Sequence, residues 1–264
     1  MTTFRHGNLD DLEAKLARLA DRSSRIIAVD GVYSMSGSYA DLPALVRIAE
    51  RHDAVIYVDD AHGFGILGEH PGPDAPFGSG GGGIMRYADV DRSRIVYVAG
   101  MSKAFSSMAA FVGCRDDEER HQFETASTMI FSGPIPVASL ASAIAGLGVN
   151  EREGDQRRAR LWSLTERLMD GARALGFTTD NRSGFPIVTL VLGDTDLVLA
   201  ACKILWEHAV LLTPAIFPAA PLDRGGLRFT LTTDNTPAQV DQVLGALAAI
   251  RVAQPAMITE VAVV

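Results

Sequence analysis

The chain has 264 residues, and its 24 basic and 32 acidic side chains give a formal net charge of −8 at pH 7. That balance argues against nucleic acid as the main partner. The hydrophobic residues, 47% of the total, form runs too short to span a membrane. Cys114 and Cys202 lack metal-binding or redox spacing, and the first residues contain no apolar secretion segment. We therefore expect a cytoplasmic protein without a metal site, long enough for one large domain or two smaller ones.

Short apolar runs alternate with amphipathic segments through the first hundred residues. The periodicity predicts helices at residues 10–20 and 41–51, a strand at residues 26–29, and buried parallel strands at residues 54–58 and 95–99. Such alternation indicates a parallel sheet with right-handed crossovers. Residues 71–83, which contain Pro-Gly-Pro and four consecutive glycines, have the composition of a flexible excursion rather than a packed element.

The second half of the chain begins with helical sequence. We expect helices at residues 138–147 and 156–175, separated by a polar break at residues 150–155. Beyond the break, the pattern predicts a small α+β domain with strands at 186–192, 210–212 and 227–231 and helices at 195–208 and 236–250. The predicted domain boundaries are therefore 1–149, a large-domain portion with a connecting helix, and 150–264, the small domain.

Three side chains of distinct chemistry follow two of the predicted strands. Asp59 and His62 come after the strand at 54–58, and Lys103 comes after the strand at 95–99. The carboxyl ends of parallel strands are where open α/β sheets bind ligands. Taken singly, each residue is more often structural, and the same holds for Asp60. Together, an acid, an imidazole and a downstream amine are what pyridoxal phosphate chemistry requires.

Several motifs resemble the α-oxoamine synthases, which are fold-type I pyridoxal phosphate enzymes that include serine palmitoyltransferase and 8-amino-7-oxononanoate synthase. The resemblance is carried by residues 30–37 (Asp-Gly-Val-Tyr-Ser-Met-Ser-Gly), 59–63 (Asp-Asp-Ala-His-Gly), 102–105 (Ser-Lys-Ala-Phe) and 227–232 (Leu-Arg-Phe-Thr-Leu-Thr). It implies an α/β fold, with part of a large domain built on a mainly parallel sheet and a small C-terminal α+β domain.

The resemblance also implies roles around the cofactor. Lys103 would hold pyridoxal phosphate as a Schiff base and later act as the base at the substrate α-carbon. Asp59 would pair with the pyridinium nitrogen, and His62 would hydrogen-bond the phenolic oxygen of the ring. Ser34 matches a serine that contacts the cofactor near that oxygen.

Three further positions complete the implied site. Arg228 matches the arginine that binds the substrate carboxylate, a task suited to a bidentate guanidinium. Ser132 matches a hydroxyl that reaches the phosphate of the neighbouring subunit, which implies a homodimer. The family usually has a phosphate-binding threonine where this chain has Gly100, so we expect either a lower affinity for the phosphate or a shift of phosphate binding to Ser102.

The implied reaction is the decarboxylative condensation of an α-amino acid with an acyl thioester of CoA or a carrier protein, giving an α-aminoketone. Family members also carry a long N-terminal part before the segment that matches residues 4–9. A non-catalytic or incomplete subunit that needs a partner chain is therefore one alternative hypothesis. An aminotransferase or another fold-type I enzyme is a second, because fold analogy alone does not decide the reaction.

Overall fold

The computed structural model describes residues 1–19 and 24–253. The chain divides into two compact units. The first comprises Met1–Val32 and Tyr39–Asp155, and the second comprises Tyr33–Ser38 and Gln156–Val264. One helix, α6 (Val137–Ala174), contains the point at which the first unit ends and the second begins. Each unit has its own four-stranded sheet.

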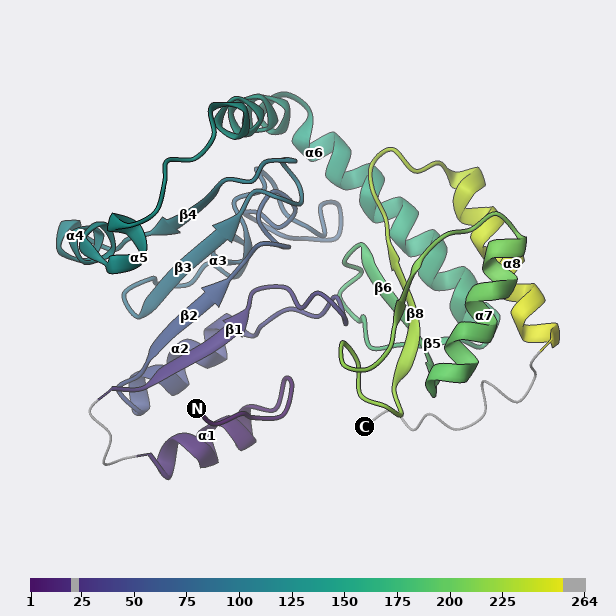
Figure 1. The fold of residues 1–264 in the computed structure, drawn as a ribbon, viewed down its shortest axis with the longest axis horizontal. Helices are drawn as coiled ribbons and strands as arrows, with labels where there is room; N and C mark the ends of the chain where they lie inside the picture. The colour runs from purple at the N-terminus through teal and green to yellow at the C-terminus, as the bar shows by residue number, and fades with distance from the viewer. Residues whose placement is uncertain (20–23, 254–264) are drawn as a thin grey trace. The chain divides into compact units, whose positions relative to one another are not determined.

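The first unit contains a sheet in the order β1-β2-β3-β4 (Figure 1). Strands β1, β2 and β3 run parallel, and β4 is antiparallel to β3. Its elements before α6 are α1 (Leu9–Ala17), β1 (Ile26–Asp30), α2 (Leu42–Arg51), β2 (Val55–Asp59), α3 (Ile84–Ala88), β3 (Ile95–Gly100), β4 (Ala110–Gly113), α4 (Asp117–Thr125) and α5 (Ser127–Ile130). The expected α/β class with a mainly parallel sheet is confirmed.

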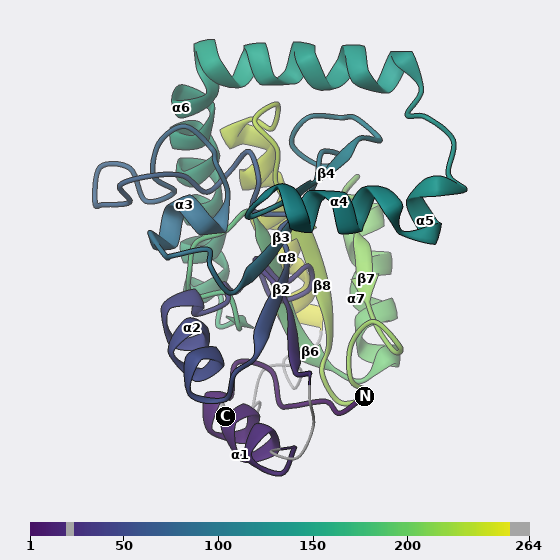
Figure 2. The same ribbon diagram turned by 90° about the vertical axis from the view of Figure 1, so that its left-hand side faces the viewer.

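Only one face of this sheet is well covered by the described residues. Helix α2 lies beside β2 (Figure 2), and Ile27 of β1 and Ile56 of β2 are 2% and 0% exposed. On the other face, Ile26 and Tyr57 are 70% and 37% exposed. The prediction of a buried strand is therefore wrong for one face of β2, and β1 is exposed on the same face. Their sequences are apolar throughout, but side chains alternate between faces and the described chain supplies no second layer.

The glycine-rich segment before α3 is a packed loop and not the flexible excursion that its composition predicted. The Gly68 N–H donates to the Phe77 carbonyl at 2.8 Å, and Glu69 and Ser79 exchange two backbone hydrogen bonds. Phe77 is only 2% exposed, so the loop is anchored by a buried aromatic ring. The loop ends at Gly83, where α3 begins, a helix start that the sequence did not reveal.

Helix α6 continues through residues 150–155, where the sequence suggested a break. The polar residues there include Glu151, Arg152 and Glu153, which are good helix formers, and one interior glycine costs only about 1 kcal/mol. Polarity marks an exposed helical surface in this case, and the helix does not end until Ala174.

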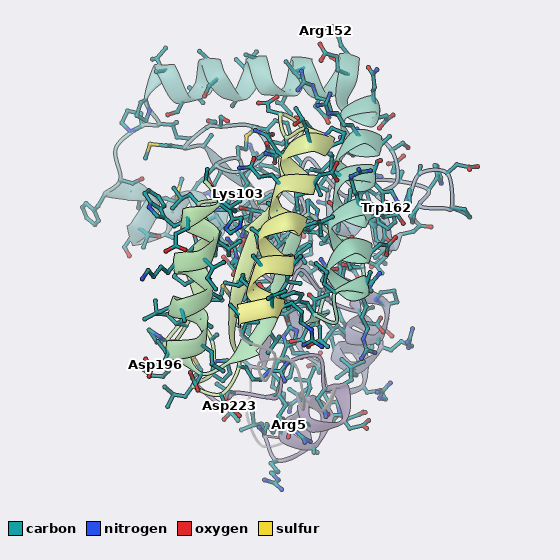
Figure 3. All side chains as sticks on the ribbon, turned by 90° about the vertical axis from the view of Figure 1, so that its right-hand side faces the viewer. Arg5, Lys103, Arg152, Trp162, Asp196 and Asp223 are labelled. Atoms are coloured by element: carbon teal, nitrogen blue, oxygen red, sulfur yellow. The ribbon has the colours of Figure 1, made fainter. Side chains whose placement is uncertain are left out.

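The second unit contains an antiparallel sheet in the order β5-β6-β8-β7. Its elements are β5 (Thr178–Thr179), β6 (Ile187–Gly193), α7 (Thr195–Glu207), β7 (Thr213–Ala215), β8 (Gly225–Thr230) and α8 (Pro237–Ala253). Helices α7 and α8 lie side by side on one face of the sheet (Figure 3). The strand expected at 210–212 is wrong, since β7 begins at Thr213. No helix in the described part of the chain combines the length and hydropathy that a membrane span requires.

Candidate functional site

Asp59 is fixed at the carboxyl end of β2 by backbone hydrogen bonds on both sides. The Gly31 N–H donates to the Asp59 carbonyl at 2.7 Å, and the next N–H, that of Asp60, donates to the Val98 carbonyl of β3 at 2.8 Å. The Asp59 side chain is exposed, and its Oδ1 accepts the Ala61 N–H at 3.0 Å. A carboxylate on a rigid strand end is thus available to a ligand at this edge of the sheet.

His62 lies on a tight turn that follows β2. The Phe64 N–H donates to the Asp60 carbonyl at 3.0 Å, and the Leu67 N–H donates to the Gly63 carbonyl at 2.8 Å. The glycine-rich loop holds this turn from outside, because the Gly65 N–H donates to the Gly81 carbonyl at 2.8 Å. His62 itself is half-buried. Its position is therefore set by backbone contacts on both sides of the turn.

Lys103 and Ser102 lie on the loop of residues 101–109, which joins the antiparallel strands β3 and β4. The Met101 N–H donates to the Ala109 carbonyl at 2.9 Å and closes the loop. Ser107, which is 3% exposed, donates from Oγ to the Ser139 carbonyl of α6 at 2.6 Å. Lys103 and Ser102 are both exposed. The base of the loop is thus anchored, and the Lys103 amine and the Ser102 hydroxyl are exposed on it.

The His62 turn and the Lys103 loop pack against each other. The rings of Phe64 and Phe105 have centroids 5.1 Å apart. A Cβ atom on Gly65 would lie 2.5 Å from the Ala104 Cβ, so the two loops touch at a point where only glycine fits. The structure therefore brings the end of β2, the His62 turn and the Lys103 loop together at one edge of the sheet.

Gly100 lies in the same crowded area. A Cβ atom there would be 3.3 Å from the Ala61 Cβ and 3.9 Å from the Ser102 Oγ. A threonine at this position would press on Ala61, which gives a steric reason for the glycine. The space beside it contains the Ser102 hydroxyl, the group expected to replace the threonine in phosphate binding.

Asp60 is a buried acid of this edge whose importance the sequence reasoning missed. It is 0% exposed, and its Oδ2 accepts the Tyr97 O–H at 2.6 Å and the Ile84 N–H at 2.7 Å. Burial raises the pKa of the Asp60 carboxyl to about 6, against the opposing effect of these two hydrogen bonds. The signal was present in the sequence, because Ile56, Val58 and Asp60 alternate with Tyr57 and Asp59 and so share the buried face.

Asp30 adds a second acid beside Asp59. The two residues are register partners at the ends of β1 and β2. Burial raises the pKa of the Asp30 carboxyl, and the neighbouring Asp59 charge raises it further. This edge therefore carries negative charge that favours a cationic group.

Ser34 and Arg228 belong to the second unit, where the structure brings them together. The Arg228 Nε donates to the Ser34 carbonyl at 2.8 Å. Two other side chains of that unit hold the same turn: the Thr189 Oγ1 donates to the Met35 carbonyl at 2.5 Å, and the Ser183 Oγ donates to the Gly37 carbonyl at 2.8 Å. Burial lowers the pKa of Arg228 from its usual value. The contact uses the Ser34 carbonyl, so the Ser34 hydroxyl is not engaged by Arg228.

Ser132 lies apart from these clusters. It follows α5, is exposed, and donates from Oγ to the Met129 carbonyl at 2.8 Å. This hydrogen bond is local to α5, and a role of Ser132 toward a neighbouring subunit stays a prediction. The described residues contain no cluster of three or more His, Cys, Asp or Glu that could hold a metal ion.

Comparison with known proteins gives one family and several close folds. The family model described as aminotransferase class I and II matches residues 2–247. The chain is 29% identical over 245 residues to a serine palmitoyltransferase of Sphingobacterium spiritivorum, covering 91% of this chain and 57% of that protein. It is 35% identical over 246 residues to an 8-amino-7-oxononanoate synthase of Thioalkalivibrio sulfidiphilus, covering 92% and 59%.

Solved structures agree with the sequence relatives. The Sphingomonas wittichii serine palmitoyltransferase superposes with a TM-score of 0.84 at 27% identity, covering 96% of this chain and 61% of that one. A serine palmitoyltransferase described as containing pyridoxal phosphate gives a TM-score of 0.80 at 28% identity. The chain thus spans about 60% of the length of the relatives that it matches.

Proposed function

The chain belongs to the aminotransferase class I and II family, a pyridoxal phosphate-dependent family, and the relatives that it matches are α-oxoamine synthases; on that premise we propose that it serves the condensation of an α-amino acid with an acyl thioester. Carbon dioxide and a thiol leave, and an α-aminoketone is formed. The observation that carries the proposal is the packing of the Lys103 loop on the His62 turn beside Asp59, at the carboxyl ends of parallel strands.

The side chains at this edge fit pyridoxal phosphate by their chemistry. An exposed carboxylate comes from the end of β2, and a half-buried imidazole, an exposed primary amine and a hydroxyl come from two loops in contact. When bound, pyridoxal phosphate supplies an electron sink that stabilises negative charge at the α-carbon of an amino acid. The Lys103 amine would hold the cofactor covalently, and the Ser102 hydroxyl would donate to its phosphate.

Three side chains of the protein would bind the ring of the cofactor and move the substrate proton. Asp59 would accept a hydrogen bond from the protonated ring nitrogen and keep the proton there. His62 would bind the phenolic oxygen. Lys103, once released from the cofactor, would remove the proton from the α-carbon of the amino acid. Since Asp59 is anchored on both sides by β1 and β3, its carboxylate needs little reorganisation to do this.

The substrate carboxylate would be bound by Arg228. Its guanidinium is partly buried and is oriented through Nε by the Ser34 carbonyl, which leaves the terminal nitrogens to form a fork for a carboxylate. We also propose that Ser34 contacts the cofactor, that Ser132 reaches the phosphate of a second copy in a homodimer, and that the protein works in the cytoplasm. CoA or a carrier protein would present the acyl group.

The number of lysines permits a sharp test. The chain has three, Lys15, Lys103 and Lys203. After incubation with pyridoxal phosphate, borohydride reduction fixes the pyridoxyl group on the lysine that holds it, and peptide mass spectrometry identifies that lysine. We expect label on Lys103 at a stoichiometry near one, and its loss in Lys103→Ala but not in Lys203→Ala, which removes another exposed amine. Equal labelling of all three lysines, or none, would refute the proposal.

The reaction type needs a separate measurement. Incubation with amino acids and acyl thioesters, followed by product analysis, should give an aminoketone and carbon dioxide. A keto acid together with aminated cofactor would instead identify an aminotransferase. Loss of product in Lys103→Ala would connect the activity to the proposed site.

A second candidate function is that of an incomplete subunit completed by a partner chain. The exposed sheet face, with Ile26 70% and Tyr57 37% exposed, favours it, since parallel sheets are normally covered on both faces. If it is right, the chain alone should bind pyridoxal phosphate weakly, and a co-purifying chain of the same family should tighten that binding. Tight binding by the chain alone would exclude it.

A further inference from the structure

We infer that Asp60 is a positioning residue for the cofactor site, an inference that rests on the proposed function. Its carboxylate is not proposed to contact the cofactor. It instead ties the turn that carries His62 to two other elements of the first unit, α3 and β3. The contacts that support this are hydrogen bonds to Oδ2 and close glycine packing around both oxygens.

The hydrogen bonds connect three elements through one atom. Oδ2 accepts the Ile84 N–H at the start of α3 and the Tyr97 O–H from β3, while Asp60 itself follows β2. The Asp60 carbonyl also accepts the Phe64 N–H of the His62 turn at 3.0 Å. One residue therefore fixes both the start of the turn and its distance from α3 and β3.

Three glycines leave room for the carboxylate. Cβ atoms on Gly31 and Gly63 would lie 2.4 Å and 2.1 Å from Oδ1, and a Cβ on Gly83 would lie 2.4 Å from Oδ2. Gly31 follows β1, Gly63 belongs to the His62 turn, and Gly83 precedes α3. Because backbone closes around the carboxylate from three segments, its removal or enlargement displaces the turn that carries His62.

Stability alone does not account for an acid at this place. No hydrogen bond of good geometry reaches Oδ1 among the described residues, and the Gly63 N–H, which lowers the pKa of the carboxyl, compensates the desolvation only in part. The pKa of Asp60 is raised to about 6 by burial, which means that the ionised form is disfavoured in the folded protein. Burial and the Asp60 charge raise the pKa of Tyr97, which therefore stays protonated and donates. A costly buried charge beside a ligand edge is typical of functional sites.

The test compares Asp60→Asn with wild type in three measurements at pH 7.5. Pyridoxal phosphate binding is followed by its absorbance, the His62 environment by the ¹³Cε1 NMR signal of labelled histidine in the cofactor-free protein, and stability by urea unfolding. We expect about a tenfold loss of cofactor affinity and a shifted His62 signal, with no loss of stability. His62→Gln assigns the signal among the six histidines.

Two variants complete the design. Asp91→Asn, which removes an exposed carboxylate before β3, should change neither the His62 signal nor the cofactor affinity. Tyr97→Phe removes one hydrogen bond to the carboxylate and should move the His62 signal and weaken cofactor binding several-fold. If Asp60→Asn does not fold, Tyr97→Phe tests whether the Asp60 carboxylate positions the His62 turn.

The inference is overturned if the His62 signal and the cofactor affinity stay at wild-type values, or if affinity falls only in proportion to stability. Failure of the proposed function looks different. In that case the wild type takes up no pyridoxal phosphate, while the His62 signal still reports whether Asp60 positions the turn.

Discussion

The buried Asp60 carboxyl predicts a pH dependence of stability with an unusual sign. Its pKa is about 6 in the folded chain, against 3.8 for the unperturbed group. Between those two values the folded protein retains a proton that the unfolded chain has released. The free energy of unfolding contributed by this group therefore falls as the pH rises through the window from 4 to 6, and the cost is complete above it.

The size of the effect follows from the shift. A difference of about two pKa units corresponds to about 3 kcal/mol, at roughly 1.4 kcal/mol per unit. Because Asp60 is 0% exposed, solvent screening does not reduce this figure. The titratable groups that act on it are Tyr97, which donates to Oδ2, and Asp59, whose charge raises its pKa further. Replacement by Asn removes the titration and should remove the slope.

The assay is urea unfolding of wild type and Asp60→Asn at intervals from pH 4 to pH 7.5. Both tryptophans, Trp162 and Trp206, lie in the second unit, so their fluorescence reports that unit, while far-UV circular dichroism reports both. Between pH 4 and pH 7.5, the free energy of unfolding of Asp60→Asn should rise by about 3 kcal/mol relative to that of wild type. We expect this change in the circular dichroism transition only.

The control has a pKa shift of the opposite sign. Hydrogen bonds from Ser93 lower the pKa of Asp91, so the stability from that carboxylate is present above its normal pKa and is lost as the pH falls. From pH 4 to pH 7.5, which lies above that normal pKa, the difference in stability between wild type and Asp91→Asn should therefore stay constant. A difference between wild type and Asp60→Asn that does not vary with pH would refute the reasoning, as would a variant that loses stability as the pH rises.

Two further substitutions probe the edge of the sheet. Gly83→Ala should destabilise the first unit by about 3 kcal/mol or more, because Gly83 has φ +87° and an added Cβ would lie 2.2 Å from the Tyr97 hydroxyl. The control is Gly133→Ala, where an added Cβ would have nothing within 4 Å, and it should leave the urea midpoint unchanged. Ser107→Ala should cost about 1–3 kcal/mol, because it removes the buried bond to the Ser139 carbonyl, and should weaken pyridoxal phosphate binding through the loosened Lys103 loop. Unaltered binding in a destabilised variant would contradict that link.

The positions of the strands, and the reactive residues that follow them, could be predicted from the sequence. Short apolar runs that end in turn residues located β1, β2 and β3 to within a residue or two, because the core selects Val and Ile strongly. Helix α2 was equally clear, since Asp41 caps it through a 3.0 Å bond from the Ala44 N–H. The pairing of Asp59, His62 and Lys103 followed from the rule that parallel strands end at one edge.

What the sequence did not reveal depended on contacts between distant segments. The glycines of residues 80–83 indicate flexibility locally, but the Asn150 side chain and Asp155 of α6 hydrogen-bond to Gly80 at 2.9 and 3.0 Å and hold the loop. The turn of residues 33–38 follows β1 in sequence and yet belongs to the second unit. Composition carries no record of such long-range bonds, so these features required the structure.

The uncovered face and edges of the first sheet affect how readily the chains associate with one another. Among the described residues β4 is an edge strand, and Phe111 and Val112 on it are 38% and 37% exposed. An open apolar edge is a template for strand addition by another chain, and the opposing force is the mutual repulsion of chains with a charge of −8. Protonation of carboxylates in mild acid removes that repulsion, and high salt screens it. Handling this polypeptide at neutral pH and low ionic strength therefore protects it from association through its own sheet.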